Sequence, residues 1–128
     1  MNRAPDFRGK AVLVTGASSG IGAATALAFA ALGARVGLLA RRRDRLEAVA
    51  RSVVHTGGEA LVLPADVGDP DAVHGAVAQC LARWNRVDVL VNNAGIGLAA
   101  AVAATTLDEF RQLHAVNVLG TVAATQAV

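Results

Sequence analysis

Four short, mainly apolar runs alternate with longer stretches of helical spacing along this chain of 128 residues. The runs span 11–14, 36–40, 61–63 and 87–91, and only Asp88 interrupts them with a charge. Runs of this length without polar alternation are typical of strands that are buried on both faces. Strands separated by helices pair in parallel through right-handed connections. The alternation therefore predicts an α/β fold with helices on both faces of one parallel sheet.

Capping residues predict where the first three helices begin and end. Gly33 is a C-terminal cap for a helix over 21–32, and Gly57 follows the second helix. Asp69 predicts the start of a third helix, because its carboxylate accepts hydrogen bonds from the first free N–H groups and Pro70 suits the first helical position. The third helix is expected to bury one apolar face, formed by Val73, Ala76, Val77, Cys80, Leu81 and Trp84.

The last quarter of the chain predicts further helix. Residues 106–109 form a capping box, and residues 120–128 have helical composition but no capping residue after them. We therefore expect a single domain over 1–128 with an incomplete sheet of about four strands. Self-association through the uncovered C-terminal helix is one expected consequence. The apolar side chains expected at its surface are Leu113, Val116, Val118, Leu119 and Val122.

Composition favours a globular protein in a reducing compartment. The sequence is 54% hydrophobic and 17% charged, which argues against disorder, and its one cysteine cannot form an intrachain disulfide. Residues 11–34 carry no charge, but the glycine-rich stretch 15–20 divides them into a strand and a helix that are each too short to cross a bilayer. Residues 1–6 contain no apolar run that would form a secretory signal. We expect a cytoplasmic protein that binds no membrane.

Three glycines, Gly16, Gly20 and Gly22, lie between the first strand and the first helix. At such a turn, backbone N–H groups and the helix dipole hold a pyrophosphate. Gly16 permits the tight turn, Gly20 lets the backbone approach the phosphates, and Gly22 lets helix and strand pack closely. A turn with a purely structural role is the alternative.

The sequence T-G-A-S-S-G-I-G over 15–22 resembles the T-G-x-x-x-G-I-G signature of the short-chain dehydrogenase/reductase family. Three further motifs resemble that family in the same order: Asp66-Val67 after the third strand, N-N-A-G at 92–95 after the fourth, and Asn117 beyond it. The resemblance extends from about Gly9 to the last residue. Four motifs on the expected elements are more specific than any one of them.

The resemblance implies a Rossmann-type doubly wound parallel sheet, with strand order 3-2-1-4, and a nicotinamide cofactor. It places Asp66 against the adenine and makes Asn117 a catalytic residue in a proton relay. It implies no metal site. The cofactor-binding residues that it implies are Gly16, Ser18, Ser19, Gly20, Ile21, Gly22, Arg41, Arg42, Asp66, Val67, Asn93, Ala94 and Gly95.

Each of the later motifs also has a structural interpretation. Asp66 is a common turn-capping residue. Asn92 and Asn93 are ordinary turn residues, although amides at the end of a buried strand need partners, which a sheet edge or a cofactor supplies. Asn117 alone is a local interruption of a helix. The functional interpretation rests on the four motifs together.

The end of the second predicted strand indicates the cofactor. An NAD-preferring fold has an acidic residue there for the ribose hydroxyls, whereas this chain has Ala40 and then Arg41. A guanidinium binds a 2′-phosphate through charge-assisted hydrogen bonds, so we interpret Arg41 as the phosphate ligand and Arg42 as a helper. NADP(H) is the expected preference, and NAD(H) stays possible. Arg43 and Arg45 are expected to face solvent, and the absence of aromatic stacking residues beside the arginines argues against nucleic acid.

The sequence has no tyrosine, and its only lysine is Lys10, before the first strand. In the resembled family a Tyr hydroxyl exchanges the proton with an alcohol or carbonyl substrate, and a Lys four residues later lowers its pKa. We interpret His55 and His74 as surface residues and assign no catalytic role to His114. Residues 97–105 are mostly alanine, so they predict an apolar wall for a small-molecule substrate and nothing more specific.

We therefore expect the N-terminal, cofactor-binding portion of an NADPH-dependent alcohol/carbonyl oxidoreductase, truncated before the Tyr and Lys and inactive alone. Two alternatives stay open. One is a non-catalytic NADP(H)-binding module, and the other is a structural subunit that completes its sheet with a partner chain.

Overall fold

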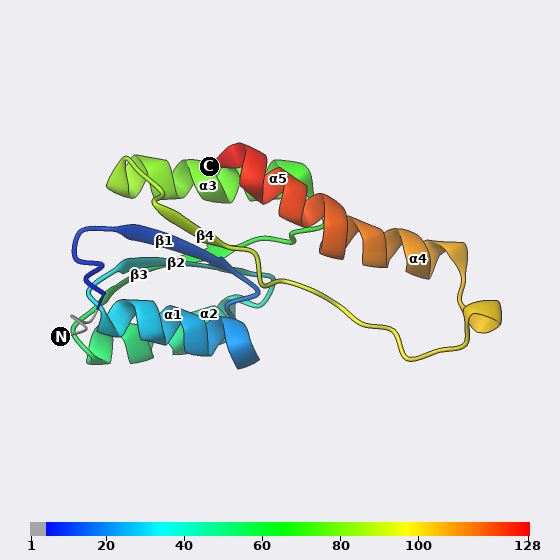
Figure 1. Ribbon diagram of the computed structural model, residues 1–128, viewed down its shortest axis with the longest axis horizontal. Helices are drawn as coiled ribbons and strands as arrows, with labels where there is room; N and C mark the ends of the chain where they lie inside the picture. The colour runs from blue at the N-terminus through cyan, green and yellow to red at the C-terminus, as the bar shows by residue number, and fades with distance from the viewer. Residues whose placement is uncertain (1–4) are drawn as a thin grey trace.

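Strands and helices alternate along the protein (Figure 1). The computed structural model describes residues 5–128. Residues 1–4, part of the segment predicted above not to form a secretory signal, lie outside the described residues. The strands are β1 (Ala11–Thr15), β2 (Arg35–Ala40), β3 (Glu59–Pro64) and β4 (Val89–Val91). The helices are α1 (Gly20–Ala31), α2 (Arg43–His55), α3 (Pro70–Trp84), α4 (Leu107–His114) and α5 (Gly120–Ala127), with a 3₁₀ turn η1 (Val102–Ala104) and a π-helical turn η2 (Ala115–Leu119).

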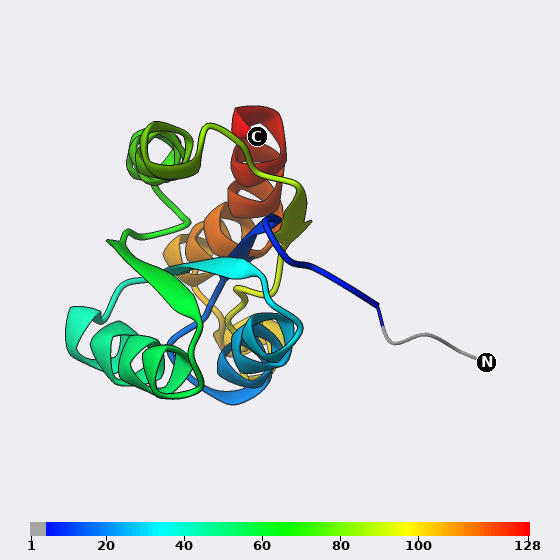
Figure 2. The same ribbon diagram turned by 90° about the vertical axis from the view of Figure 1, so that its left-hand side faces the viewer.

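The four strands form one parallel sheet in the order β3-β2-β1-β4. Val12 in the centre of β1 pairs with Val36 of β2 on one side and with Val89 of β4 on the other. Figure 2 shows the sheet between two layers of helices, with α1 and α2 on one face and α3 and α5 on the other. The predicted fold class and the predicted strand order are confirmed.

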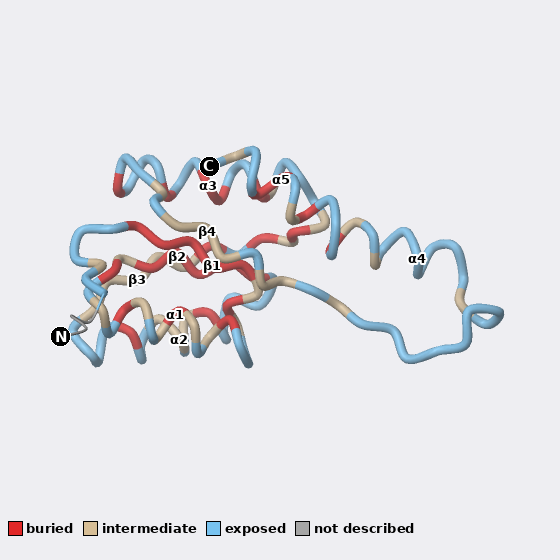
Figure 3. The backbone as a smooth tube through the Cα atoms, in the orientation of Figure 1, coloured by how far each residue is buried: buried red, intermediate tan, exposed pale blue. Residues whose placement is uncertain are grey.

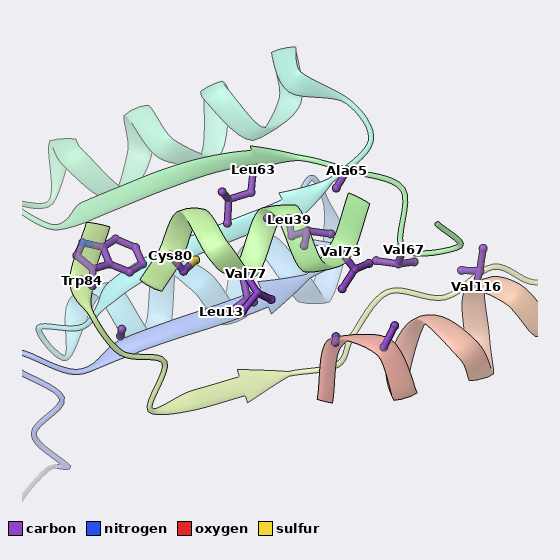
Figure 4. Packing of buried hydrophobic residues seen from close by; sticks show 14 residues of the cluster. Leu13, Leu39, Leu63, Ala65, Val67, Val73, Val77, Cys80, Trp84 and Val116 are labelled. Atoms are coloured by element: carbon purple, nitrogen blue, oxygen red, sulfur yellow. The ribbon is translucent and has the colours of Figure 1, made fainter. Parts of the chain in front are cut away.

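Alternate residues of the strands fill two separate cores. Leu13, Leu39 and Leu63 point toward α3, where they pack with Val77 and Cys80 (Figure 4). The neighbouring residues of the same strands face α1 and α2 instead, and the buried residues of this second core are Val12, Val14, Ala17, Ala26, Ala30, Ala34, Val36, Leu38, Ala40, Leu46 and Val53. Because both faces are buried, the strands need no polar alternation, which explains the apolar runs.

The predicted face of α3 is correct except at one position. Val73, Ala76, Val77, Cys80 and Trp84 are buried, as expected. Leu81 was expected on the same face, but its exposed fraction is 41%. It follows Cys80 by one residue, and a step of about 100° around the helix turns it away from the sheet.

Helix boundaries follow the predicted capping residues. The carboxylate of Asp69 accepts hydrogen bonds from the N–H groups of Asp71 and Ala72. Gly33 and Gly57 follow α1 and α2 with positive φ angles of 91° and 85°. Thr106 and Glu109 cap each other's backbone N–H groups at the start of α4, so the capping box is confirmed. The backbone N–H and the hydroxyl of Thr106 both donate to the Glu109 carboxylate, which holds the pKa of Glu109 below its usual range.

The segment after β4 and the following helix extend away from the sheet. Figure 3 shows the loop and α4 almost wholly exposed, whereas α5 returns to the sheet beside α3. Val118, Leu119 and Val122 are about half exposed, as predicted, but Val116 is buried at 7% because it packs against the core under α3. Within residues 5–128, no helix is long and apolar enough to cross a membrane.

Candidate functional site

A cleft of about 270 Å³ lies at the carboxyl ends of the four strands. In an open parallel sheet this edge is where ligands bind. The segments that follow β1, β2, β3 and β4 each contribute to its lining, and η2 contributes one side chain. The lining residues are Gly16, Ser18, Ser19, Ala40, Arg41, Arg42, Ala65, Asp66, Val67, Asn93, Ala94, Gly95, Ile96 and Val116.

The glycine turn between β1 and α1 forms one side of this cleft. Gly16 has a φ of +65°, and a Cβ there would stand 2.8 Å from the Cα of Ala94. Gly22 is buried against the same turn, where a Cβ would meet the carbonyl oxygen of Gly16 and stand 2.5 Å from Nδ2 of Asn93. Gly20, with a φ of +54°, faces open space. A ligand can therefore approach the backbone at Gly20, while Gly16 and Gly22 keep the turn closely packed.

Thr15 and Asn93 join the glycine turn to the segment after β4. The Thr15 hydroxyl accepts hydrogen bonds from the N–H groups of Asn93 and Ala94, at 3.1 and 3.0 Å. The Asn93 amide donates to the carbonyl oxygens of Thr15 and Gly16, both at 3.2 Å. Asn93 therefore lines the cleft and also fixes the backbone of the glycine turn.

The end of β2 supplies the positive charge of the cleft. Ala40 ends the strand, and the exposed side chains of Arg41 and Arg42 follow it on the cleft wall. Among the described residues, neither guanidinium forms an ion pair. Arg43 and Arg45 are exposed outside the cleft, as predicted, and Arg43 pairs with Glu47 at 3.6 Å.

Asp66 both caps a turn and lines the cleft. Its Oδ1 accepts a hydrogen bond from the N–H of Gly68 at 2.8 Å, which is the structural interpretation considered above. The second carboxylate oxygen is free of any such bond within residues 5–128. Val67 beside it is buried, and its carbonyl would stand 2.6 Å from a Cβ on Gly120, so this turn packs directly on α5.

Asn117 lies in the π-helical turn η2 and does not line the cleft itself. Its side-chain amide pairs with the backbone of Ile96 in both directions: Oδ1 accepts from the Ile96 N–H, and Nδ2 donates to the Ile96 carbonyl, each at 2.8 Å. Ile96 and Val116, its neighbours in space and in sequence, do line the cleft. The structure therefore brings Asn117 to the edge of the site.

Ten of the thirteen predicted cofactor-binding residues line the cleft, and Gly20, Ile21 and Gly22 do not. Gly20 and Ile21 are exposed at the start of α1, and Gly22 is buried beneath the turn. Four residues at the site were not predicted from the sequence: Thr15, Ala65, Ile96 and Val116. Thr15 belongs to the glycine motif and is the one polar residue that is buried within residues 5–128, whereas the other three are apolar and carry no chemical signal.

The remaining titratable candidates lie away from the cleft. Lys10 precedes β1 at the amino ends of the strands, where its Nζ is 4.0 Å from Asp88. The guanidinium of Arg86 and the N–H of Ala11 hold the pKa of Asp88 below its usual range. His55, His74 and His114 are exposed outside the cleft. Within the described residues, no cluster of His, Cys, Asp and Glu fits a metal ion.

The cleft has the groups that a phosphorylated dinucleotide requires. The first turn of α1, which lies wholly within the described residues, carries no acidic side chain that would repel an anion. Gly20 leaves the backbone open at that helix start, and two guanidinium groups without ion pairs lie on the wall after β2. The described residues therefore fit a nicotinamide dinucleotide with an added phosphate.

Comparison with known proteins identifies the family. The family model of short chain dehydrogenases matches residues 10–128. The chain belongs to the short-chain dehydrogenase family. Glucose 1-dehydrogenase of Gluconobacter oxydans is 44% identical over 115 residues, which are 89% of this chain and 43% of that protein.

Two solved short-chain dehydrogenase structures extend this finding to the fold. A metagenomic short-chain oxidoreductase in complex with NADP is 41% identical, with a TM-score of 0.91 over 94% of this chain and 55% of that one. A short chain dehydrogenase from Burkholderia cenocepacia in complex with NADP is 40% identical, with a TM-score of 0.92 over 96% and 51%. The chain spans 33–49% of the length of the curated short-chain dehydrogenases and other relatives that it matches.

Proposed function

We propose that this chain is the cofactor-binding part of a cytoplasmic NADPH-dependent oxidoreductase that acts on alcohols or carbonyl compounds. Membership of the short-chain dehydrogenase family and the NADP held by two similar structures support a nicotinamide cofactor. Bound NADPH supplies a hydride. The residues of this chain bind that cofactor and orient it.

The preference for NADPH rests on the wall after β2. Arg41 and Arg42 line the cleft where an NAD-preferring protein carries an acidic side chain, and neither forms an ion pair within the described residues. A carboxylate there would repel a 2′-phosphate, whereas a guanidinium donates two charge-assisted hydrogen bonds to one. Asp66, on the adjacent wall, has a free carboxylate oxygen suited to an amino group such as that of adenine.

The glycine turn receives the pyrophosphate in this proposal. The open backbone at Gly20 and the N-terminus of α1 supply N–H donors and a partial positive charge. Ser18, which has a hydroxyl to offer, lines the cleft beside them. Asn117 acts at the opposite end, where its amide fixes the Ile96 backbone at the edge of the reaction site.

Proton transfer requires groups that this chain lacks. It has no tyrosine, and its one lysine is at the amino ends of the strands. The 128-residue chain alone is therefore proposed to bind NADPH without turnover. Steady-state assays with NADPH and a panel of carbonyl compounds test this, and turnover that Asn117→Ala abolishes would contradict it.

Titration with both cofactors tests the preference directly. Wild type is expected to bind NADPH at least about tenfold more tightly than NADH, because hydrogen bonds to a charged group contribute about 1.5–3 kcal/mol. Arg41→Ala is expected to remove most of this difference by weakening NADPH alone.

Arg45→Ala is the matched control, since Arg45 is an exposed arginine of the same cluster that lies outside the cleft. Arg45→Ala should leave the ratio of NADPH affinity to NADH affinity unchanged. An unaltered ratio in Arg41→Ala would show that Arg41 is only a surface charge, and the proposed preference would fail.

A further inference from the structure

The segment Asn92 to Ile96 leaves β4 and forms a continuous wall of the cleft, hereafter the β4 wall. Four of its five residues line the cleft: Asn93, Ala94, Gly95 and Ile96. β4 itself has three residues, and within residues 5–128 its only neighbour in the sheet is β1. The sheet therefore supports the β4 wall from one side only, through Thr15 and Asn93.

Two hydrogen-bonded anchors support the β4 wall from its other side, one at each end. At the far end, the Asn117 amide pairs with the backbone of Ile96. At the near end, the Asn92 amide donates to the hydroxyl of Thr125 at 3.1 Å. That hydroxyl donates in turn to the carbonyl oxygen of Thr121 at 2.7 Å, which fixes its orientation on α5.

The two anchors follow each other in opposite order along the two segments. Asn117 and Thr125 are eight positions apart along η2 and α5, and their partners Ile96 and Asn92 are four positions apart along the β4 wall. Figure 1 shows β4 and the following loop running beneath α5 in the opposite direction. The helix therefore contacts the β4 wall at both of its ends.

We propose that Thr125 is a positioning residue for the cofactor cleft, an inference that rests on the proposed NADPH binding. Its hydroxyl holds Asn92 and so keeps the backbone of Ala94 and Gly95 at the position where it meets the cofactor. The Asn92 amide is engaged by α5 and is a support for the wall. It is not itself a ligand, since the cleft lining begins at Asn93.

Cofactor affinity is the first measurement. Thr125→Val removes the hydroxyl and keeps the shape of the side chain, and it is expected to weaken NADPH binding about three- to tenfold. Thr125→Ser restores the hydroxyl and should bind NADPH as wild type does. Asn92→Ala should weaken NADPH binding to a similar degree. The double variant should bind NADPH about as weakly as either single variant, because both substitutions remove the same Asn92–Thr125 hydrogen bond.

Thr121→Val is the matched control. The Thr121 hydroxyl makes the same kind of bond to the carbonyl four residues earlier, at 3.3 Å to Asn117, but within residues 5–128 it forms no hydrogen bond to the β4 wall. Its NADPH affinity is expected to stay within about twofold of wild type. An equal loss in Thr121→Val would assign the effect to the helix and overturn the inference.

Amide hydrogen exchange in the protein without cofactor is the second measurement. Thr125→Val should speed exchange at Ala94 and Ile96, whose N–H groups bond to Thr15 and Asn117, while the melting temperature changes little. Wild-type protein that binds no NADPH would overturn the proposed function. Wild-type binding with unchanged affinity and exchange in Thr125→Val would overturn the role of Thr125 alone.

Discussion

At the scale of single residues, the glycine turn shows how the absence of a side chain serves two purposes. A Cβ at Gly22 would collide with the carbonyl oxygen of Gly16 and the Asn93 amide, whereas a Cβ at Gly20 would meet nothing within 4 Å. The first glycine permits close packing and the second leaves backbone open to a ligand. Both roles were predicted from the spacing of the motif in the sequence.

Gly22→Ala tests the packing role. The added methyl group has no space, so we expect a loss of about 1–3 kcal/mol in the free energy of unfolding, measured by chemical denaturation. Gly75→Ala is the control, because Gly75 lies inside α3 with nothing within 4 Å of its Cβ position. It should raise the free energy of unfolding by about 0.5–1 kcal/mol. A destabilised Gly75→Ala or an unaffected Gly22→Ala would contradict this assignment.

The bonding partners of some site residues could not be predicted, because they lie far away in the sequence. Thr15 joins β1 to the β4 wall across more than seventy positions of sequence, and Asn117 reaches Ile96 across twenty-one. The sequence around such a polar residue indicates neither which residue it bonds to nor where its side chain points. Arg41 was predictable, since its position at the end of β2 follows from the strand pattern alone.

At the scale of elements, apolar runs and capping residues predicted all four strands and the starts of α3 and α4. β3 begins earlier than predicted, at Glu59, because pairing of Arg35 with Glu59 extends the ladder beyond the apolar run. The π-helical turn η2 had no signal in the sequence. Asn117 lies in this turn and pairs with Ile96, a long-range contact that local spacing cannot reveal.

The packing of α3 on β2 predicts an inert thiol. Cys80 is fully buried, its Sγ lies 3.0 Å from the Cβ position of Gly37, and burial raises its pKa to about 11. Since the folded pKa is above the ordinary value of 9.0, the contribution of this thiol to stability is full below pH 9 and is lost as pH rises toward 11.

Thiol labelling measures this packing. At pH 8 we expect an alkylating reagent to modify Cys80 only as fast as the protein opens, because the buried thiol is neutral and shielded. In denaturant, Cys80 should be labelled at the rate of a fully accessible cysteine. Rapid labelling of the folded protein would show that α3 does not pack on β2 as described.

At the scale of the whole molecule, the core on both faces of the sheet and the extended α4 segment differ in how far their apolar side chains are buried. The large apolar side chains of the sheet and of α1 to α3 are at least partly buried, except Ile21, Val54 and Leu81, whereas those of the loop and α4 are mostly exposed (Figure 3). The exposed large side chains from the loop to η2 are Leu98, Val102, Leu107, Phe110, Val118 and Leu119, and Val122 follows them on α5. The fold class, strand order and site location followed from the sequence, whereas the direction in which α4 extends did not.

We propose that the exposed region makes the isolated chain self-associate. A monomeric protein rarely exposes a large contiguous apolar patch. Light scattering should detect species larger than a monomer, and limited proteolysis should cut between η1 and α4 before it cuts the sheet. A compact monomer that resists cleavage through Val128 would contradict this expectation.

The proposed function requires that the segments after all four strands form one cofactor cleft. Hydrogen–deuterium exchange of the wild-type chain with and without NADPH measures this. We expect slower exchange in four segments together, 16–22, 40–42, 66–68 and 93–96, and no change at 56–58, the turn at the opposite edge of the sheet. Unchanged exchange in those four segments at saturating NADPH, or protection confined to other parts of the chain, would contradict it.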